Sequence, residues 1–162
     1  MYDFKIAAVD KETLYRELAS ALEGLIAGEP DPIANMANAI ALIWETLPDL
    51  NWAGFYFNRG GALVLGPFQG KPACVRIPWG KGVCGTAAAS GASVIVPDVH
   101  EFPGHIACDP NSRSELVVPL VRAGAVAGVL DLDSPVLARF DEVDRIGIER
   151  LAAILIASLG QE

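Results

Sequence analysis

The sequence predicts an α+β protein, in which a central antiparallel sheet carries helices packed on it. Three observations lead to this prediction. Apolar residues recur at helical spacing at both ends of the chain, within residues 11–47 and again within 141–159. Between them, residues 52–134 hold short apolar stretches separated by tight turns, which is typical of antiparallel strands. Helices from both ends of the chain can then cover one face of that sheet.

The three long helices carry sequence signals at their ends. The first is followed by Gly28, a residue type that commonly ends a helix. The second begins at Asp31-Pro32, which suits an N-cap followed by proline at the first helical position, and Pro48 stops it. The third has Asp141 as its expected N-cap. We therefore predict helices over about 11–27, 31–47 and 141–159.

The middle of the chain predicts two hairpins and an excursion between them. Arg59-Gly60-Gly61 and Arg122-Ala123-Gly124 are turn signals. They join strands over 52–57 and 62–68, and over 115–121 and 126–132. The segment between the hairpins is expected to hold short strands over 73–77 and 93–96, a short helix over 86–89, and a long polar loop over 97–113.

Length and composition indicate a single folded domain. The chain has 162 residues, of which 52% are hydrophobic and 20% charged, and this excludes intrinsic disorder as its main state. The formal net charge is -8, from 20 acidic and 12 basic side chains. An acidic surface argues against nucleic acid and anionic membranes as partners, because both require clustered Lys and Arg.

The first ten residues lack the basic segment and apolar run of a signal peptide. No apolar stretch reaches the roughly 18 residues needed to cross a bilayer. We therefore expect a soluble cytoplasmic protein. In that reducing compartment, a static disulfide framework among the three cysteines is not expected. The cysteines are then small core residues, metal ligands or reactive thiols.

Two of the cysteines have both a packing and a chemical interpretation. Cys74 falls in the expected strand over 73–77, where a buried core position is the simpler interpretation. Cys84 lies between Gly82 and Gly85, which suggests a close approach of the backbone. A thiol at a helix start near Lys81 would have a stabilised thiolate, but a packing residue in a tight turn explains the pattern equally well.

Cys108 is the strongest candidate for a reactive thiol. It lies in the predicted polar loop, where side chains are exposed, and an exposed cytoplasmic thiol is a liability unless it is used. His105, three residues upstream, could assist the thiolate. The neighbouring Asp109 acts in the opposite sense, because a negative charge raises the pKa of a thiol.

A zinc site is disfavoured by spacing. The three cysteines, together with His100 and His105, supply enough ligands for one ion. The sequence has no Cys-X-X-Cys pair, however, and the cysteines are far apart along the chain. We therefore predict no metal ligands.

Acidic residues form a second group of candidates. Asp131 and Asp133 are two residues apart, so both side chains point to one face of the expected strand, and Glu115 opens the paired strand. Crowding and partial burial would raise at least one pKa, giving a proton donor or a binding site for a cationic ligand. In the alternative interpretation, Asp133 caps the turn at Ser134-Pro135 and one of the pair faces water.

The aromatic strand over 52–57 has two faces. Trp52, Gly54 and Tyr56 share one face, and the three alternate residues share the other. One set belongs to the core, and the other could line a small pocket. The alternation alone does not assign the sets.

Taken together, these segments resemble the free methionine-(R)-sulfoxide reductase family, whose members are enzymes built on a GAF domain. The resemblance covers roughly residues 52–144 and includes all three family cysteines in order. The segments that carry it are Asn51-Trp52-Ala53-Gly54-Phe55-Tyr56, residues 66–74, residues 80–87, residues 96–100, residues 102–109, Ser114-Glu115, and residues 130–134.

The resemblance implies one GAF domain over residues 1–162 and reduction of free methionine (R)-sulfoxide to methionine. Cys108 matches the attacking cysteine of the family, and Cys74 and Cys84 match the resolving positions, with Cys74 favoured as the first resolver. Thioredoxin is the implied reductant, supplied by NADPH through thioredoxin reductase, with no bound cofactor. The resemblance to a GAF domain is compatible with a homodimer, but the sequence places no interface and leaves the oligomeric state open.

The resemblance also implies the residues of the substrate site. Its acidic members are Glu115, Asp131 and Asp133, and its aromatic members are Trp52 and Tyr56. The family alone supplies the preference for the R epimer. Which carboxyl group donates the proton, and which holds the substrate ammonium, stays open.

The chemistry of a sulfoxide is consistent with these residue types. Its oxygen leaves readily only when it is protonated, which a carboxylic acid of raised pKa can do. A thiolate then attacks sulfur, and a second thiol converts the resulting sulfenic acid to a disulfide. The free amino acid is also a zwitterion. A carboxylate can hold its ammonium group, the backbone N–H groups of Gly80–Thr86 can hold its carboxylate, and Trp52 can pack on its S-methyl group.

A function of another class is a GAF sensor that binds a small ligand and signals to a partner. The sequence shows no output domain and no helical linker after the third helix, which argues against it. Substrate-dependent loss of thiols distinguishes the two functions.

Overall fold

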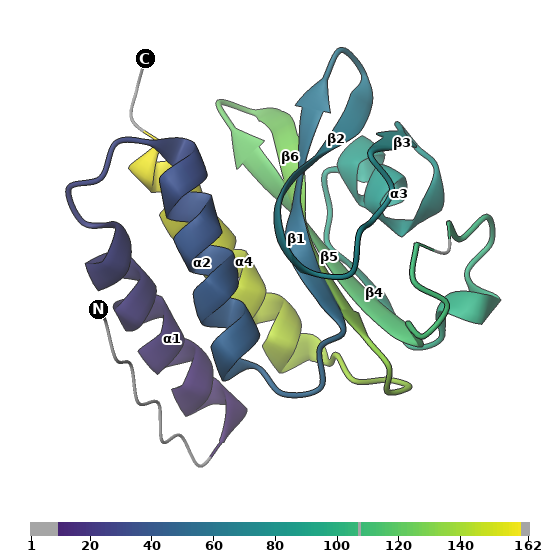
Figure 1. Cartoon of the computed structure of the whole chain (residues 1–162), viewed down its shortest axis with the longest axis horizontal. Helices are drawn as coiled ribbons and strands as arrows, with labels where there is room; N and C mark the ends of the chain where they lie inside the picture. The colour runs from purple at the N-terminus through teal and green to yellow at the C-terminus, as the bar shows by residue number, and fades with distance from the viewer. Residues whose placement is uncertain (1–9, 107, 160–162) are drawn as a thin grey trace.

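A single antiparallel sheet organises the computed structural model, which describes residues 10–106 and 108–159. Its strands have the order β3-β2-β1-β6-β5-β4, and each is antiparallel to its neighbours. The elements, labelled in Figure 1 except for the 3₁₀ turn, are α1 (Lys11–Ile26), α2 (Pro32–Thr46), β1 (Trp52–Arg59), β2 (Ala62–Gly70), β3 (Arg76–Pro78), α3 (Gly82–Ser90), β4 (Val94–Val96), the 3₁₀ turn η1 (Val99–Glu101), β5 (Ser114–Arg122), β6 (Ala125–Ser134) and α4 (Glu142–Ser158).

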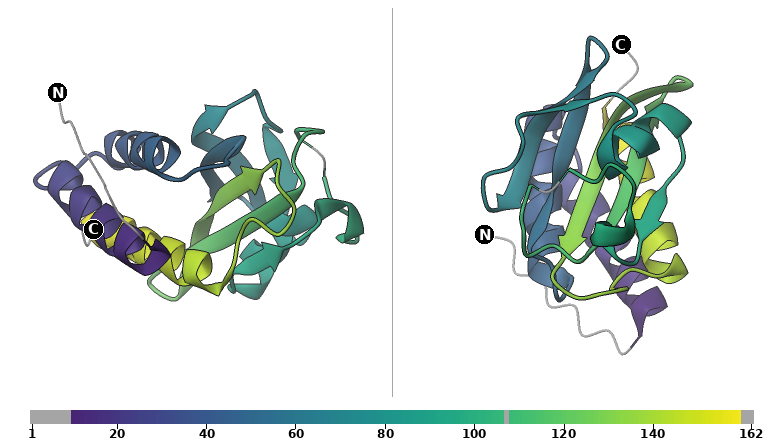
Figure 2. Two further views of the ribbon diagram at one scale, coloured as in Figure 1. Left: turned by 90° about the horizontal axis from the view of Figure 1, so that it is seen from below. Right: turned by 90° about the vertical axis from the view of Figure 1, so that its right-hand side faces the viewer.

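The helices are divided unequally between the two faces of the sheet. Helices α2 and α4 pack on one face, α1 packs against these two helices on the same side, and α3 and the long connections lie on the other face (Figures 1 and 2). The α+β architecture predicted from the sequence is confirmed, with helices from both ends of the chain on the same face.

The predicted helix starts are confirmed by capping contacts. The Asp31 side chain accepts hydrogen bonds from the backbone N–H groups of the first turn of α2, and Pro32 follows it. Asp141 caps α4 and forms a capping box with Asp144. Helix α1 ends at Ile26, just before Gly28, which has a positive φ of 79°.

The two predicted hairpins are also present, and their turns contain residues of positive φ. Gly60 and Gly61 have φ values of 63° and 83°, and Ala123 and Gly124 have values of 49° and 77°. Two successive residues of positive φ give the turn twist that suits paired antiparallel strands. The sequence pattern therefore located both turns.

The excursion between the hairpins differs from the prediction. The expected strand over 73–77 is wrong at its start, because β3 begins at Arg76 and leaves Cys74 in the preceding loop. Carbonyls of this loop accept hydrogen bonds from side chains: Trp52 Nε1–H donates to Lys71 O, and Tyr56 O–H to Cys74 O. These two hydrogen bonds hold the loop that contains Cys74, although it is not part of a strand.

The short helix predicted over 86–89 is longer than expected. Helix α3 begins at Gly82, so Cys84 lies in its first turn. The start is fixed by a close approach: a Cβ atom on Gly85 would lie 2.6 Å from Pro78 O. The glycine is required by this contact, and the expectation of a close backbone approach near Cys84 is confirmed. The predicted loop over 97–113 also contains η1.

The sheet separates two apolar clusters, which assigns the two faces of β1. Ala53 and Phe55 pack with the three long helices. Trp52 and Tyr56 pack on the opposite side, with α3 and the neighbouring connections. Gly54 lies between them and leaves room for the Trp52 ring, since a Cβ atom there would lie 2.4 Å from Trp52 Cη2.

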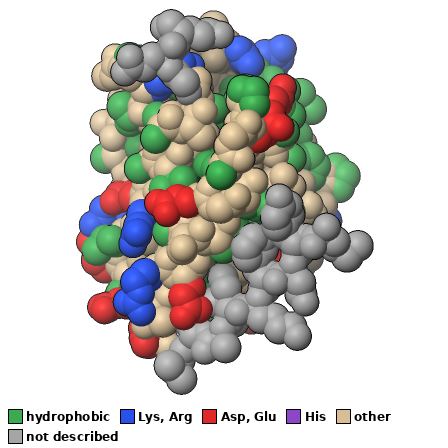
Figure 3. Space-filling view, turned by 90° about the vertical axis from the view of Figure 1, so that its left-hand side faces the viewer, with side chains coloured by type: hydrophobic (Ala, Val, Ile, Leu, Met, Phe, Trp, Pro, Cys, Tyr) green, Lys and Arg blue, Asp and Glu red, His purple; other side chains and the backbone are tan. Residues whose placement is uncertain are grey.

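The surface of the helical layer has an interspersed pattern of charge. In Figure 3, basic side chains in the lower half of this face lie beside acidic ones. No helix within residues 10–106 and 108–159 is long and apolar enough to cross a membrane.

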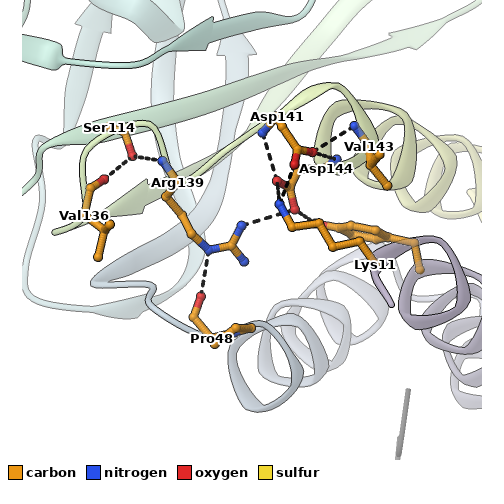
Figure 4. A network of polar contacts seen from close by, with 9 residues as sticks. Lys11, Pro48, Ser114, Val136, Arg139, Asp141, Val143 and Asp144 are labelled. Carbon is orange, nitrogen blue, oxygen red and sulfur yellow. Dashed lines mark hydrogen bonds and ion pairs between the residues drawn. The ribbon is translucent and has the colours of Figure 1, made fainter. Parts of the chain in front are cut away.

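A buried carboxylate joins α1, α4 and the connection after β6. Asp144, only 1% exposed, accepts hydrogen bonds from Tyr15 O–H at 2.8 Å and from the Asp141 backbone N–H at 2.9 Å. It also pairs with Lys11 Nζ at 2.6 Å and Arg139 Nη1 at 3.2 Å (Figure 4). One side chain therefore holds two helices and the Arg139 segment together.

Replacing Asp144 with alanine is expected to lower the free energy of unfolding by about 3 kcal/mol, because the substitution leaves the buried Tyr15 hydroxyl without its acceptor and the Arg139 guanidinium without its carboxylate. Urea unfolding followed by circular dichroism measures this loss. Glu142→Gln is the matched control. Glu142 is an exposed acid of the same helix turn that pairs with Arg145, so its loss should barely change the free energy of unfolding. Equal effects of the two substitutions would contradict this role of Asp144.

Candidate active site

One pocket collects the candidate residues on the face of the sheet opposite the long helices. It lies between α3 and two connections, one before β3 and one before β5. Every predicted site residue except Cys74 lines it: Trp52, Tyr56, Cys84, Cys108, Glu115, Asp131 and Asp133. Cys74 joins the site through a disulfide bond with Cys108.

The strand register brings the acids together. Glu115 on β5 lies opposite Asp133 on β6, and directly paired residues project to the same face of a sheet. Asp131 lies opposite Gly54 on β1, and Asp133 lies opposite Trp52. Because Gly54 carries no side chain, the Trp52 ring lies over it, next to its partner Asp131.

The acids are withdrawn from water. Glu115 and Asp131 are 5% and 6% exposed, and burial raises the pKa of both carboxyl groups, that of Asp131 to about 6. Burial, together with the charge of Asp131, also raises the pKa of Asp133. The expectation of at least one carboxyl group with a raised pKa is met.

The structure does not support the alternative interpretation of Asp131 and Asp133, in which Asp133 caps a turn and one of the two carboxylates faces water. The turn after β6 is capped by the Ser134 hydroxyl, which accepts from the Val136 backbone N–H at 3.1 Å. Asp131 is buried, and its Oδ1 atom has no hydrogen-bond partner among the described residues. A buried acceptor without a donor is costly, so this oxygen is suited to binding a cationic group.

Cys84 is held as a neutral thiol. Its Sγ atom lies 3.2 Å from Asp131 Oδ2 and 4.0 Å from Glu115 Oε1. Burial raises the pKa of this thiol, and the two neighbouring carboxyl groups raise it further. The expectation of a thiolate stabilised by the helix start and Lys81 is therefore wrong, because burial and two adjacent acids outweigh the helix dipole.

Cys74 and Cys108 form a disulfide with their Cα atoms 5.8 Å apart, across a sequence separation of 34 residues. Cys108 is exposed and Cys74 is half-buried, whereas the free Cys84 is buried. The bond fits the expectation that Cys74 rather than Cys84 is the first partner of Cys108.

Polar contacts that the sequence pattern did not predict hold the segment around Cys108. Asp109 accepts from the Asn111 backbone N–H at 2.9 Å and from Asn51 Nδ2 at 3.2 Å, and it pairs with Lys71 Nζ at 3.4 Å. The first of these contacts, with support from the others, lowers the pKa of Asp109. The negative charge beside Cys108 is thus partly balanced by Lys71. Asn51 immediately precedes the aromatic strand, which is the one local sign of its place at the pocket.

The two histidines have different positions. His105 Nε2 lies 3.7 Å from Glu115 Oε2 in the pocket, and burial lowers the pKa of the ring. His105 therefore faces an acid of the site. His100 Nδ1 is paired with Asp98 at 2.8 Å on the surface, and His100 is not among the residues that line the pocket.

The prediction of no metal ligands considered only the spacing of cysteines and histidines along the sequence. That spacing does not reveal one group of possible ligands that the fold brings together. Ligand atoms of Cys84, Glu115 and Asp131 lie within 4.8 Å of one another, although these residues come from α3, β5 and β6. They are a set of donors that no linear motif reveals.

Comparison with known proteins agrees with this geometry. The sequence profile described as "GAF domain" matches residues 35–157. The chain is 51% identical to "Free methionine-R-sulfoxide reductase" of Escherichia coli over 147 residues, covering 91% of this chain and 89% of that one. It is 44% identical to the protein of that name in Saccharomyces cerevisiae over 155 residues, with coverages of 91% and 86%.

Among solved structures, that of the free methionine-R-sulfoxide reductase of Neisseria meningitidis in complex with its substrate superposes with a TM-score of 0.95. It is 47% identical and covers 98% of this chain and 96% of that chain. The chain therefore belongs to the GAF-domain family. Within that family, it groups with the free methionine-R-sulfoxide reductases, as the sequence resemblance predicted.

Proposed function

We propose that this protein reduces free methionine (R)-sulfoxide to methionine, using Cys108 as the nucleophile. The observation that carries the proposal is the Cys74–Cys108 disulfide beside a pocket of buried acids. The activity that names the Escherichia coli and yeast relatives supports it. Each of these features supplies one requirement of sulfoxide chemistry.

The pocket offers complementary groups for a zwitterionic amino acid. The ammonium group is held by the acids, among which the unpartnered Asp131 Oδ1 is directly available. The N-terminal backbone of α3, whose Gly82 and Val83 line the pocket, faces the carboxylate. Trp52 packs on the S-methyl group. A methionine sulfoxide within a polypeptide lacks both charged ends and is therefore rejected.

The reductive step moves one oxygen from substrate to enzyme. A protonated carboxyl group of Glu115, Asp131 or Asp133 donates its proton to the sulfoxide oxygen, and the Cys108 thiolate attacks the sulfoxide sulfur. As the S–O bond of the substrate breaks, methionine leaves with its sulfur reduced by two electrons. Cys108 is oxidised by two electrons to the sulfenic acid.

The resolving step forms the disulfide seen in the structure. The Cys74 thiol condenses with the Cys108 sulfenic acid, an S–S bond forms, and one water leaves. An external dithiol then reduces the disulfide. Thioredoxin, supplied by NADPH through thioredoxin reductase, is the proposed reductant in a cytoplasmic setting. The exposed position of Cys108 allows such an attack.

The volume of the cavity indicates which redox form binds substrate. In the disulfide form it measures ≈ 30 Å³. That volume holds one or two water molecules and is too small for an amino acid. We therefore expect substrate to bind the reduced form, in which the Cys74–Cys108 bond no longer joins the two connections.

Counting free thiols tests the proposed reaction. The fully reduced chain has three thiols, and free methionine (R)-sulfoxide is expected to remove two of them in one turnover without added reductant. A chiral amino acid assay on racemic substrate should show consumption of the R epimer alone. A chain that binds the sulfoxide but retains all three thiols would be a sensor and not a reductase.

A further inference from the structure

Three side chains with metal-binding atoms, Cys84, Glu115 and Asp131, meet in the active-site pocket. Cys84 Sγ lies 3.2 Å from Asp131 Oδ2 and 4.0 Å from Glu115 Oε1. The imidazole of His105 lies beside this group, with Nε2 3.7 Å from Glu115 Oε2. All four residues line the same cavity.

These separations come close to the requirements of a single small ion. In tetrahedral zinc sites, metal–ligand distances of about 2.0–2.3 Å place neighbouring ligand atoms roughly 3.3–3.7 Å apart. The two carboxylate oxygens lie 3.2 and 4.0 Å from Cys84 Sγ, and all three donor atoms lie within 4.8 Å of one another, so small side-chain shifts would bring them to that spacing. The backbone positions of these residues are well defined, because Cys84 lies in helix α3 and Glu115 and Asp131 lie in the paired strands β5 and β6. Little rearrangement is therefore required to bind the ion.

One oxygen of this group also lacks a hydrogen-bond partner in the described part of the chain. Asp131 is only 6% exposed, and its Oδ1 atom has no hydrogen-bond partner among the described residues. Asp133 adds a third acid nearby. Lys71 lines the pocket as well, but it pairs with Asp109. This unpartnered oxygen is an observation separate from the grouping of the donors, and it too points to a positively charged ligand.

We propose that Cys84, Glu115 and Asp131 bind one borderline divalent cation of the zinc class in this pocket. A thiolate ligand favours Zn²⁺ over Mg²⁺ and Ca²⁺, which prefer six or more oxygen ligands. The ion displaces the protons of the thiol and carboxyl groups. A bound ion occupies the place of the substrate ammonium and removes the proton donor, so it inhibits by competition with substrate.

Cobalt spectroscopy tests the ligand set directly. The untagged protein is used with the Cys74–Cys108 disulfide closed, so that Cys84 is its free thiol. One Co²⁺ per chain is expected, with a sulfur-to-metal charge-transfer band and the intense visible bands of tetrahedral geometry, and Zn²⁺ should abolish both. Bound Co²⁺ without the charge-transfer band would overturn the assignment of Cys84 as a ligand.

Two variants and a control make the assignment specific. Cys84→Ser and Asp131→Asn are each expected to weaken Zn²⁺ binding, measured by equilibrium dialysis, by at least about tenfold. Glu149→Gln removes an acid of α4 that pairs with Arg145 and Ser93, and it should bind Zn²⁺ as the wild type does. Circular dichroism checks the folding of each variant, and Asp131→Asn decides the question if Cys84→Ser does not fold. Wild-type affinity in a folded variant, or an absence of Zn²⁺ binding by the wild type, would refute the site.

The metal proposal and the proposed reductase activity can fail separately. Zinc binding is measured on the resting disulfide form without any substrate. If the chain binds Zn²⁺ but consumes no thiols with methionine sulfoxide, only the proposed activity fails. If it reduces the sulfoxide but binds no Zn²⁺, only the metal site fails.

Discussion

Replacing Cys108 with serine is expected to lower turnover of free methionine (R)-sulfoxide by at least about 10³-fold, which is a typical minimum loss when a nucleophile is removed. A serine hydroxyl has no accessible anion at neutral pH and cannot form a sulfenic acid. The pocket keeps its acids and aromatic residues in this variant, because Cys108 lies in a connection and is exposed. Substrate binding should therefore persist while the chemical step is lost.

The loss is measured in two assays. Consumption of NADPH with thioredoxin and thioredoxin reductase reports sustained turnover, and methionine released from the reduced enzyme alone reports a single round. Both should fall to background. Cys74→Ser is the matched control, because it removes the same disulfide and leaves the nucleophile in place. Full single-round release by Cys108→Ser would show that another residue attacks the sulfoxide.

Replacing Cys74 with serine should separate the two half-reactions. Attack on the sulfoxide does not involve Cys74, so one methionine per chain is expected in the single-round assay. Sustained turnover with thioredoxin should be lost, because the sulfenic acid on Cys108 then has no partner within the chain that reaches it directly. A rapid-quench measurement of methionine, followed by the coupled assay, gives both results from one preparation.

The same variant also distinguishes Cys74 from Cys84 as the first resolving cysteine. Cys84 is buried, and its thiol is 3.2 Å from Asp131, so it is poorly placed to form a thiolate. If the Cys74→Ser variant turns over at the wild-type rate and the additional Cys84→Ser change stops it, Cys84 is the first resolver. That outcome would contradict the order favoured by the observed disulfide.

Much of the fold could be predicted because its signals are local. The capping aspartates, Asp31 and Asp141, lie within a few residues of the backbone groups that they satisfy. The hairpin turns carry their own glycines, at Gly60-Gly61 and at Gly124. Each of these features depends on a short segment whose chemistry is the same in the sequence and in the folded chain.

The candidate site was predictable in its members but not in its contacts. Cys84 is 31 residues from Glu115 and 47 from Asp131, so their contact depends on strand register and on the start of α3. That contact reverses the electrostatic expectation for the Cys84 thiol. Similarly, Cys74 appeared as a strand residue, because the hydrogen bonds that hold its loop come from Trp52 and Tyr56, about twenty residues earlier.

Trapping the oxidised sulfur tests the central claim most directly. The reduced Cys74→Ser variant is treated with free methionine (R)-sulfoxide in the presence of dimedone, and the digest is examined by mass spectrometry. We predict one dimedone adduct, on Cys108, formed with the R epimer and absent with methionine. If methionine is released and Cys108 never appears as an adduct or in a cross-link, oxygen transfer to this sulfur is contradicted.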